Sequence, residues 1–210
     1  STITYTDNSK DYKDFQPGEH FLELSQSEKD MVDLVCSNFD NVVLVYNGAN
    51  TFELDFAQNY EQIKSVIWCP GTGQSGFKAL GEIVSGGVNP SGKTSDTFVH
   101  DLTTTPYYNN IGSYMYDNTE ELNYDNGDKG DIAPSLINYV EGIYVGYRFY
   151  ETADAEGLID YDKTVHYPFG YGLSYTDFEQ TMGDIQLDGD GNISVDVTVT
   201  NTGDTAGKDT

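Results

Sequence analysis

The sequence has few cations and no long apolar run. Its 210 residues include 10 Lys and Arg against 35 Asp and Glu, which gives a formal net charge of −25. A field of that sign repels nucleic acids and anionic membrane surfaces, so we expect neither as a partner. No apolar stretch reaches the roughly 18 residues of a membrane span, and the first residues do not resemble a signal peptide. The excess of negative charge is compatible with neutral ligands such as sugars.

Cysteine and histidine are also scarce. The two cysteines, Cys36 and Cys69, follow apolar residues, so buried free thiols are favoured over a disulfide, and two thiols alone cannot complete a zinc site. The three histidines, His20, His100 and His166, do not have the spacing of metal ligands, and each is predicted to be a loop or packing residue. The sequence therefore predicts no metal and no cofactor.

The compartment stays undetermined. Free thiols favour the cytoplasm. The chain starts at Ser1 without a methionine and ends in a polar turn, which indicates a fragment. A signal peptide in the absent amino terminus, and hence secretion, stays open.

Residues 65–92 organise the chain. Val66–Cys69 is a short β-branched and aromatic run typical of a buried strand, and Pro70 ends it. A glycine-rich loop, Gly71–Gly76, leads into a helix whose apolar residues Phe77, Leu80, Ile83 and Val84 recur at helical spacing. Gly86-Gly87 ends this helix. In parallel α/β sheets, ligands bind outside the carboxyl ends of the strands.

The loop Gly71–Gly76 also has the bare GxGxxG spacing of a dinucleotide-binding turn. An acidic residue about 20 positions further on would support that interpretation. That region is the turn Ser91–Lys93, and no Lys-Ser/Thr pair follows the glycines. A tight structural turn is the better interpretation, and a nucleotide-binding domain remains a rival.

The preceding residues predict further α/β elements. Ser25 and Glu28 have the spacing of a capping box, and the following helix, marked by Met31, Leu34 and Val35, ends near Phe39. Val42–Tyr46 is apolar on both faces, as a central parallel strand should be. A short helix is predicted at Phe52–Tyr60. The order helix, strand, helix, strand, helix predicts a mostly parallel sheet with helices on both faces, a three-layer α/β/α sandwich.

The pattern changes after Lys93. Residues 95–138 have few apolar runs and form a long irregular excursion, ordered structure returns at Tyr139–Tyr150, and residues 154–163 form an acidic loop. From Phe178 onward, apolar and polar residues alternate with a period of two, and Asp188–Asn192 is a hairpin-type turn. We therefore expect an α/β domain over residues 1–176 and the truncated start of an antiparallel β-sandwich over 177–210.

Three long motifs carry a resemblance to a known family. Asn89–Lys93 with Thr97-Phe98, then Tyr139–Tyr150, then Tyr167–Tyr175 resemble the carboxy-terminal half of glycoside hydrolase family 3, the β-glucosidase family. Val199–Lys208 resembles the start of that family's fibronectin-III-like domain. The resemblance implies a retaining, exo-acting β-glycosidase that cleaves terminal β-linked sugars, and a barrel-like domain upstream of the sandwich.

The resemblance also implies two carboxylates, an aspartate nucleophile and a glutamate acid/base, roughly 5–5.5 Å apart in a retaining enzyme. The nucleophile's domain lies upstream. The acid/base belongs to a Ser-Gly-Glu-Gly motif in the three-domain enzymes. Glu19 lies only six residues before Ser25 and is followed by His20, so we interpret it as a loop or surface carboxylate. We therefore assign no catalytic residue and expect the fragment alone to be inactive.

Another branch of the family, the plant exo-glucanases, carries the acid/base glutamate in the Pro-Gly loop, where this chain has Thr72, Gly73 and Gln74 and no carboxylate. An amide cannot deliver a proton at neutral pH. Gln74, together with Asn47 and Asn50 after the central strand, is a candidate for substrate binding, and for the two asparagines helix capping is the alternative. A non-catalytic carbohydrate-binding or scaffolding module remains the rival function.

The single arginine of the chain, Arg148, is predicted to form an ion pair with Glu141 or Glu151, and a sugar contact is the alternative. The sugar specificity, whether for glucose, xylose or N-acetylglucosamine, is not determined by these residues.

Overall fold

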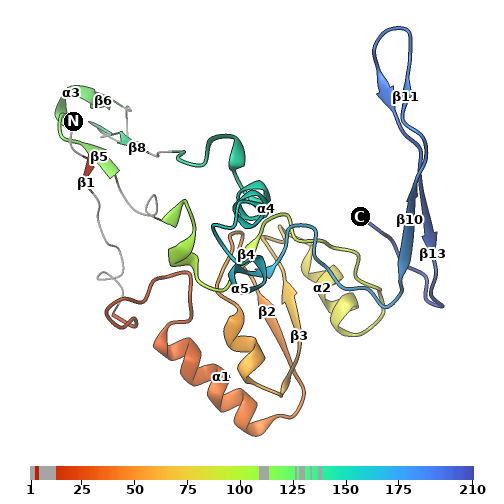
Figure 1. Ribbon diagram of the computed structural model, residues 1–210. Helices are drawn as coiled ribbons and strands as arrows, with labels where there is room; N and C mark the ends of the chain where they lie inside the picture. Colours follow the sequence, from red (N-terminus) through yellow and green to blue (C-terminus); the bar gives the residue numbers. More distant parts are fainter. Residues whose placement is uncertain are drawn as a thin grey trace. The chain divides into compact units, whose positions relative to one another are not determined.

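The computed structural model describes residues 3–4, 13–108, 114–125, 127, 131–132, 134–136 and 139–210 (Figure 1). The chain forms two compact units, one of residues 1–70 and 96–168 and one of residues 71–95 and 169–210. The chain passes between the units three times. Predictions that fall on residues 1–2, 5–12 or the gaps between 109 and 138 lie outside the described residues.

The first unit is built on a pair of parallel strands. β2 (Val42–Tyr46) and β3 (Ile63–Trp68) are paired from Val42 and Ile63 to Tyr46 and Trp68, with an irregularity after Val42. The 3-10 helix η2 (Asp55–Asn59) lies in the connection between them. The α/β class is confirmed. Among the described strand pairs, this one alone is parallel.

The strand β2 has the predicted bounds, but its side chains are not all buried as predicted. Val42, Leu44 and Tyr46 are half-buried, whereas Val43 and Val45 are exposed. The prediction of an apolar strand covered on both faces is therefore wrong for the described residues. Alternate side chains of a strand point to opposite faces, so one face of β2 is covered less than the other.

The helix α1 (Gln26–Asn38) begins with the predicted capping box. The Ser25 hydroxyl accepts the Glu28 N–H, and the Glu28 carboxylate accepts the Ser25 N–H at 2.9 Å. Phe39 is the C-cap, as predicted.

The apolar face predicted for α1 is wrong for Met31 and Leu34, whereas Val35 is half-buried. Met31 and Leu34 are exposed, and the buried residues are Val32 and Cys36, which are four positions apart and so lie on one side of the helix. Cys36 and Cys69 are both buried free thiols, as predicted.

The core of the first unit lies in residues that the sequence predicted as irregular. β4 (Phe98–Val99) and the 3-10 helix η3 (Leu102–Thr104) contain its most buried side chains, because Phe98, Val99 and Leu102 are at most 1% exposed. The Phe98 ring packs edge-on against Trp68, with ring centroids 5.0 Å apart. A two-residue strand is too short to show a period, and for this reason the pattern missed it.

The strand β9 (Val165–Tyr167) pairs antiparallel with β4 and carries a bulge. Phe98 pairs with Tyr167 and Val99 with Val165, so His166 is the extra residue. A bulge re-aims the side chain of its extra residue and is a common device near functional sites.

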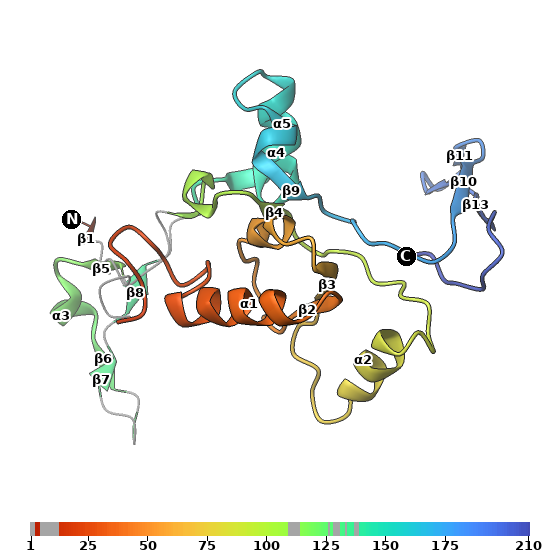
Figure 2. The same cartoon turned by 90° about the horizontal axis from the view of Figure 1, so that it is seen from below.

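Two helices cover this strand pair (Figures 1 and 2). α4 (Tyr147–Ala155) and α5 (Tyr161–Thr164) lie beside β4 and β9, and Tyr150 of α4 joins Val99, Leu102 and Val165 in the core. The acidic loop predicted at 154–163 is thus partly helical. The remaining short elements of this unit are β1 (Ile3–Thr4), β5 (Tyr114–Tyr116), α3 (Thr119–Leu122), β6 (Tyr124–Asp125), β7 (Asp131–Ile132), β8 (Ser135–Leu136) and η6 (Gly142–Tyr144).

In the second unit, α2 (Phe77–Val84) lies where it was predicted, between the loop Gly71–Gly76 and Gly86-Gly87. Gly86, with φ of 76°, follows its C-cap in the left-handed conformation that favours glycine. No residue of α2 is buried: Leu80 and Ile83 are half-buried, and Phe77 and Val84 are exposed. The prediction of one packed helix face is therefore confirmed only for its two central residues.

Two of the motifs that carry the family resemblance are hydrogen-bonded to each other in the second unit. The Asn89 amide oxygen accepts the Ser174 hydroxyl at 3.0 Å and the Tyr175 N–H at 2.9 Å. Thr94 N–H donates to the Tyr171 carbonyl at 2.7 Å, and the Lys93 ammonium donates to the Gly172 carbonyl at 2.7 Å. The turn after α2 is thereby fixed to the Tyr171–Tyr175 segment.

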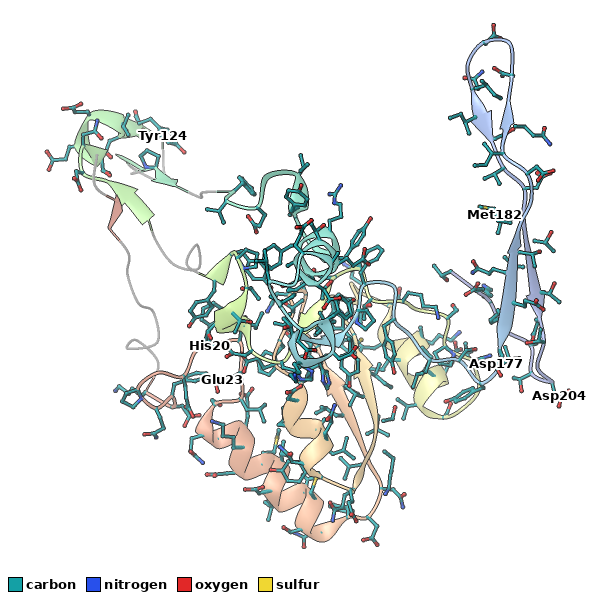
Figure 3. The ribbon with its side chains drawn as sticks, viewed as in Figure 1. His20, Glu23, Tyr124, Asp177, Met182 and Asp204 are labelled. Atoms are coloured by element: carbon teal, nitrogen blue, oxygen red, sulfur yellow. The ribbon has the colours of Figure 1, made fainter. Side chains whose placement is uncertain are left out.

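The end of the chain is a β-ribbon. β10 (Phe178–Met182) pairs antiparallel with β13 (Val197–Asn201), and β11 (Gln186–Leu187) with β12 (Ile193–Ser194). Asp188 closes the predicted turn by accepting the Asn192 N–H at 2.8 Å. Figure 3 shows Asp177, Met182 and Asp204 along this ribbon. Within the described residues, no helix combines the length and apolarity needed to span a bilayer.

Candidate functional site

The carboxyl ends of β2 and β3 meet at one edge of their sheet, and Asn47 connects them. Its side-chain N–H donates to the Cys69 carbonyl at 2.6 Å. Trp68 reaches back in the same way, and its indole N–H donates to the Gly48 carbonyl at 2.7 Å. Asn47 therefore fixes the two strand ends relative to each other and is itself exposed, which keeps it available to a ligand.

Asn50 lies in the same loop and is exposed. Its side-chain N–H donates to the Thr51 carbonyl at 2.8 Å, and its side chain also hydrogen-bonds Tyr46. Burial raises the pKa of Tyr46, with the Asn50 hydrogen bond opposing. Neither asparagine caps η2, whose N-cap is Leu54 without a side-chain bond, so the capping alternative is wrong.

The third predicted ligand, Gln74, is exposed in the loop before α2. It belongs to the second unit, whereas the two asparagines belong to the first. Of the three residues, only Asn47 and Asn50 are brought together, because they share one loop. The contact of all three with a substrate stays a prediction.

Glu19 is occupied by local contacts. Its carboxylate accepts the Lys29 ammonium at 2.5 Å and the Gln16 N–H at 2.7 Å. The Lys29 hydrogen bond, followed by that of Gln16, holds the pKa of Glu19 below its usual value. A general acid needs a raised pKa near the working pH. Glu19 lies in a loop, as predicted, and its lack of a catalytic role stays a prediction.

The ion pair predicted for Arg148 is wrong. Among the described residues it forms no ion pair; its guanidinium carbon lies 5.9 Å from the centroid of the Tyr147 ring. Arg148 is exposed on α4, where water already solvates the charge and a carboxylate partner adds little.

A cluster of Asp55, His100 and His166 is the feature that the sequence missed. The Asp55 carboxylate lies 2.6 and 2.7 Å from His100 Nδ1 and 2.8 Å from His166 Nδ1. Burial lowers the pKa of His166. The charge of Asp55 opposes this shift, and the charge of His100 lowers the pKa further. Gln58 Nε2 lies 3.3 Å from His166 Nδ1.

The spacing argument did not detect this cluster because the fold, rather than the sequence interval, brings these histidines together. Asp55 begins η2, His100 follows β4, and His166 is the bulge residue of β9. The only available signal was the pair of short apolar runs next to His100 and His166, which an antiparallel pairing of those runs would have aligned.

A second cluster surrounds His20. Its Nε2 lies 3.2 Å from Glu53 Oε1 and 3.9 Å from Glu23 Oε1, and its Nδ1 accepts the Leu22 N–H at 3.2 Å. Glu53 Oε1 also accepts the Leu102 N–H at 2.7 Å. Figure 3 labels His20 and Glu23 side by side in the segment before α1. This cluster ties that segment to the core.

The pKa of His20 predicts how the free energy of unfolding depends on pH. Burial opposes its protonation, but the hydrogen bond and charge of Glu53, with the charges of Glu23 and Asp101, raise the pKa above 6.5. A raised folded-state pKa gives stabilisation that is complete below pH 6.5 and is lost as pH rises through the folded-state pKa. The wild-type unfolding free energy minus that of His20→Gln should therefore fall as pH increases from about 6 to 8.5, by at most about 1.4 kcal/mol per pH unit.

Urea unfolding of both proteins in EDTA, followed by Trp68 emission, measures this difference. His100 and His166 are present in both chains and cancel in the subtraction. A difference that rises with pH would contradict the assignment.

Comparison with known proteins gives a consistent result. The profile of the glycosyl hydrolase family 3 C-terminal domain matches residues 4–147. Beta-glucosidase A of Butyrivibrio fibrisolvens is 36% identical over 166 residues, which cover 79% of this chain and 17% of that protein. Exo-alpha-(1->6)-L-arabinopyranosidase of Bifidobacterium longum is 33% identical over 184 residues, 87% of this chain and 20% of that protein.

Solved structures are also similar. The β-glucosidase from Paenibacillus barengoltzii has a TM-score of 0.61 and 31% identity, covering 86% of this chain and 17% of that one. The β-glucosidase from Kluyveromyces marxianus in complex with glucose has a TM-score of 0.60 and 27% identity, covering 88% and 18%. The chain thus spans about a fifth of the length of these relatives.

Proposed function

Because the chain belongs to glycosyl hydrolase family 3, as its C-terminal domain, we propose that it is part of a retaining, exo-acting β-glycosidase. The proposed reaction is hydrolysis of terminal β-linked glucose from oligosaccharides or glucosides. The observation that carries it is the 36% identity to a β-glucosidase over 79% of the chain.

The chemistry needs two carboxylates, one to attack the anomeric carbon and one to protonate the leaving oxygen. Three half-buried carboxylates of the first unit have other partners: Glu19 pairs with Lys29, Glu53 with His20 and Asp55 with the two other histidines. We therefore propose that nucleophile and acid/base belong to residues upstream of this chain, and that an upstream barrel domain is its partner.

The proposed contribution of this chain is a wall of the substrate cleft. Asn47 and Asn50 follow β2 at the edge where α/β sheets bind ligands. Each amide offers both a donor and an acceptor, which suits the hydroxyl groups of a sugar. Gln74, in the loop after β3, is proposed as a third contact.

The finer architecture is also part of the proposal. Residues 1–176 are assigned to a three-layer α/β/α sandwich with a mostly parallel sheet, supported by the parallel pair β2–β3 and its helical connection. Residues 177–210 are assigned to the start of a fibronectin-III-like domain, supported by the antiparallel ribbon. A two-stranded ribbon needs further strands for a stable sandwich.

The sugar is less constrained than the reaction class. A glucose complex of one relative favours glucose. The arabinopyranosidase relative, however, is nearly as similar as the glucosidase. We propose a β-glucoside as the substrate, and the assay below includes an aryl α-L-arabinopyranoside as the competing substrate.

The test is hydrolysis of aryl glycosides by the 210-residue chain, alone and mixed with the separately prepared upstream half. We expect no turnover by the chain alone and aryl β-glucoside turnover on mixing. Asn50→Ala in the mixture should raise KM, whereas Asn118→Ala, at an exposed position outside the loop, should not.

Turnover by the chain alone would refute the division of the active site, and Glu19 and Glu141 would then be mutated first. Sugar binding without turnover in the mixture would support the non-catalytic module instead.

A further inference from the structure

Among the described residues of the first unit, two side-chain clusters bring histidine together with carboxylates: Asp55–His100–His166, and His20–Glu23–Glu53. The second is already used by the fold. His20 Nδ1 accepts a backbone N–H and Nε2 faces Glu53, whose oxygen in turn accepts the Leu102 N–H. Withdrawing these atoms to bind an ion would cost those hydrogen bonds.

The first cluster has a different geometry. Both histidines direct the same ring atom, Nδ1, to a single carboxylate, and the three donor groups lie within 4.8 Å of one another. Zn²⁺ binds imidazole nitrogens at about 2.0–2.1 Å and carboxylate oxygens at about 2.0–2.2 Å. The three side chains can therefore bind one ion once their donor atoms move slightly apart.

The elements that carry the three residues hold them in place. Asp55 begins η2, and His166 is the extra residue of the bulge that β9 makes against β4. His100 is held by its backbone N–H, which donates to the Thr164 carbonyl just before β9 at 3.0 Å. The His100 and His166 rings meet edge-on at 5.0 Å between centroids.

The cluster is buried on one side and open on the other. The His166 side chain is 2% exposed, whereas His100 is 30% and Asp55 41% exposed. Three protein ligands with solvent on the remaining side leave a coordination position for water, which is the arrangement of zinc sites with an open fourth position. The chain's net charge of −25 raises the local concentration of cations.

We propose that Asp55, His100 and His166 bind one divalent transition-metal ion, with Zn²⁺ as the ion to test because two imidazoles and a carboxylate are also the ligands of His₂Glu zinc sites. The ion joins η2 to the β4–β9 pair. It thereby fixes the far end of the loop that begins at Asn47 and contains Asn50. The inference is independent of the glycosidase assignment.

The test uses the full 210-residue chain without a histidine tag, stripped with EDTA. Zn²⁺ affinity is measured by competition with a chromophoric chelator, and Co²⁺ is added separately to record visible absorption. We expect one Zn²⁺ per chain and a Co²⁺ spectrum typical of four-coordinate N/O ligation. His100→Gln or Asp55→Asn should each weaken Zn²⁺ binding by at least about 100-fold, above the effect of changing an outer-shell partner.

Glu23→Gln is the matched control, because it changes a carboxylate of the other cluster, and its Zn²⁺ affinity should equal that of the wild type. Excess Ca²⁺ should not displace Zn²⁺, since Ca²⁺ prefers oxygen ligands. Circular dichroism and Trp68 emission establish that each variant is folded.

Equal Zn²⁺ binding by wild type and His100→Gln, or displacement by Ca²⁺, would overturn the proposal in favour of non-specific binding to surface carboxylates. Absence of both stoichiometric Zn²⁺ binding and the Co²⁺ spectrum in the wild type would overturn it without any variant.

Discussion

Phe98→Ala is expected to lower the free energy of unfolding by about 3–5 kcal/mol, the range for deleting a buried aromatic ring. Phe98 is 1% exposed, and its ring lies edge-on against Trp68 at 5.0 Å and Tyr167 at 6.2 Å. The substitution removes apolar contacts on both sides and leaves a cavity where β4 meets β3 and β9.

The single tryptophan of the chain makes this measurable, because Trp68 contacts the mutated position and reports on the first unit. Urea unfolding followed by its emission gives the free energy. Phe39→Ala is the matched control in the same unit: its side chain is exposed, and we expect a change within about 0.5 kcal/mol. If Phe98→Ala does not fold, Phe98→Leu is measured in its place. Equal losses for Phe98→Ala and Phe39→Ala would contradict the assignment of Phe98 to the core.

Gly172→Ala is expected to destabilise the second unit by about 3 kcal/mol, the upper end of the range for overpacked positions. A Cβ at Gly172 would overlap the backbone carbonyl oxygen of Gly92 and would lie 3.0 Å from Cδ of Lys93. A backbone oxygen cannot rotate away as a flexible side chain can. The segment must shift, which weakens the hydrogen bonds that fix residues 93–94 to residues 170–172.

Hydrogen exchange of the Thr94 and Gly170 amides measures this effect directly. Thr94 donates to the Tyr171 carbonyl and Gly170 to the Thr94 carbonyl. Both amides should exchange about 100-fold faster in Gly172→Ala, the factor that corresponds to about 3 kcal/mol.

Gly92→Ala is the matched control, since a Cβ there meets nothing within 4 Å and its φ needs no glycine. Exchange should be unchanged in that variant. Unchanged exchange in Gly172→Ala as well would show that the two segments are not in contact in solution.

The elements predicted well are those whose signal is local. Val42–Tyr46 was predicted to the residue, and the helix Phe77–Val84 was predicted between the loop Gly71–Gly76 and Gly86-Gly87, since each has a continuous or periodic apolar pattern bounded by turn residues. The Ser25–Glu28 capping box is similarly local, because both hydrogen bonds join residues three apart. Such patterns determine where an element begins and ends.

The errors concern which face is covered and which distant segments meet. Leu34 has the pattern of a core residue and is exposed, because burial of a helix face depends on what packs against it. Phe98 and Leu102 lie in a polar stretch, and their burial depends on pairing with β9 about seventy residues later. The Asp55–His100–His166 cluster depends on the same pairing, so the sequence interval between its members carried no information about it.

The discontinuity of the second unit has a consequence for biosynthesis. Residues 71–95 leave the ribosome before their partners at 169–210, with about seventy residues between them, so at ~5–20 residues per second they wait roughly 4–15 s. During that interval Asn89 and Thr94 lack their hydrogen-bond partners, because Tyr171, Ser174 and Tyr175 have not yet been synthesised. The first unit's central strands, in contrast, are separated by one short connection and can pair as soon as β3 emerges.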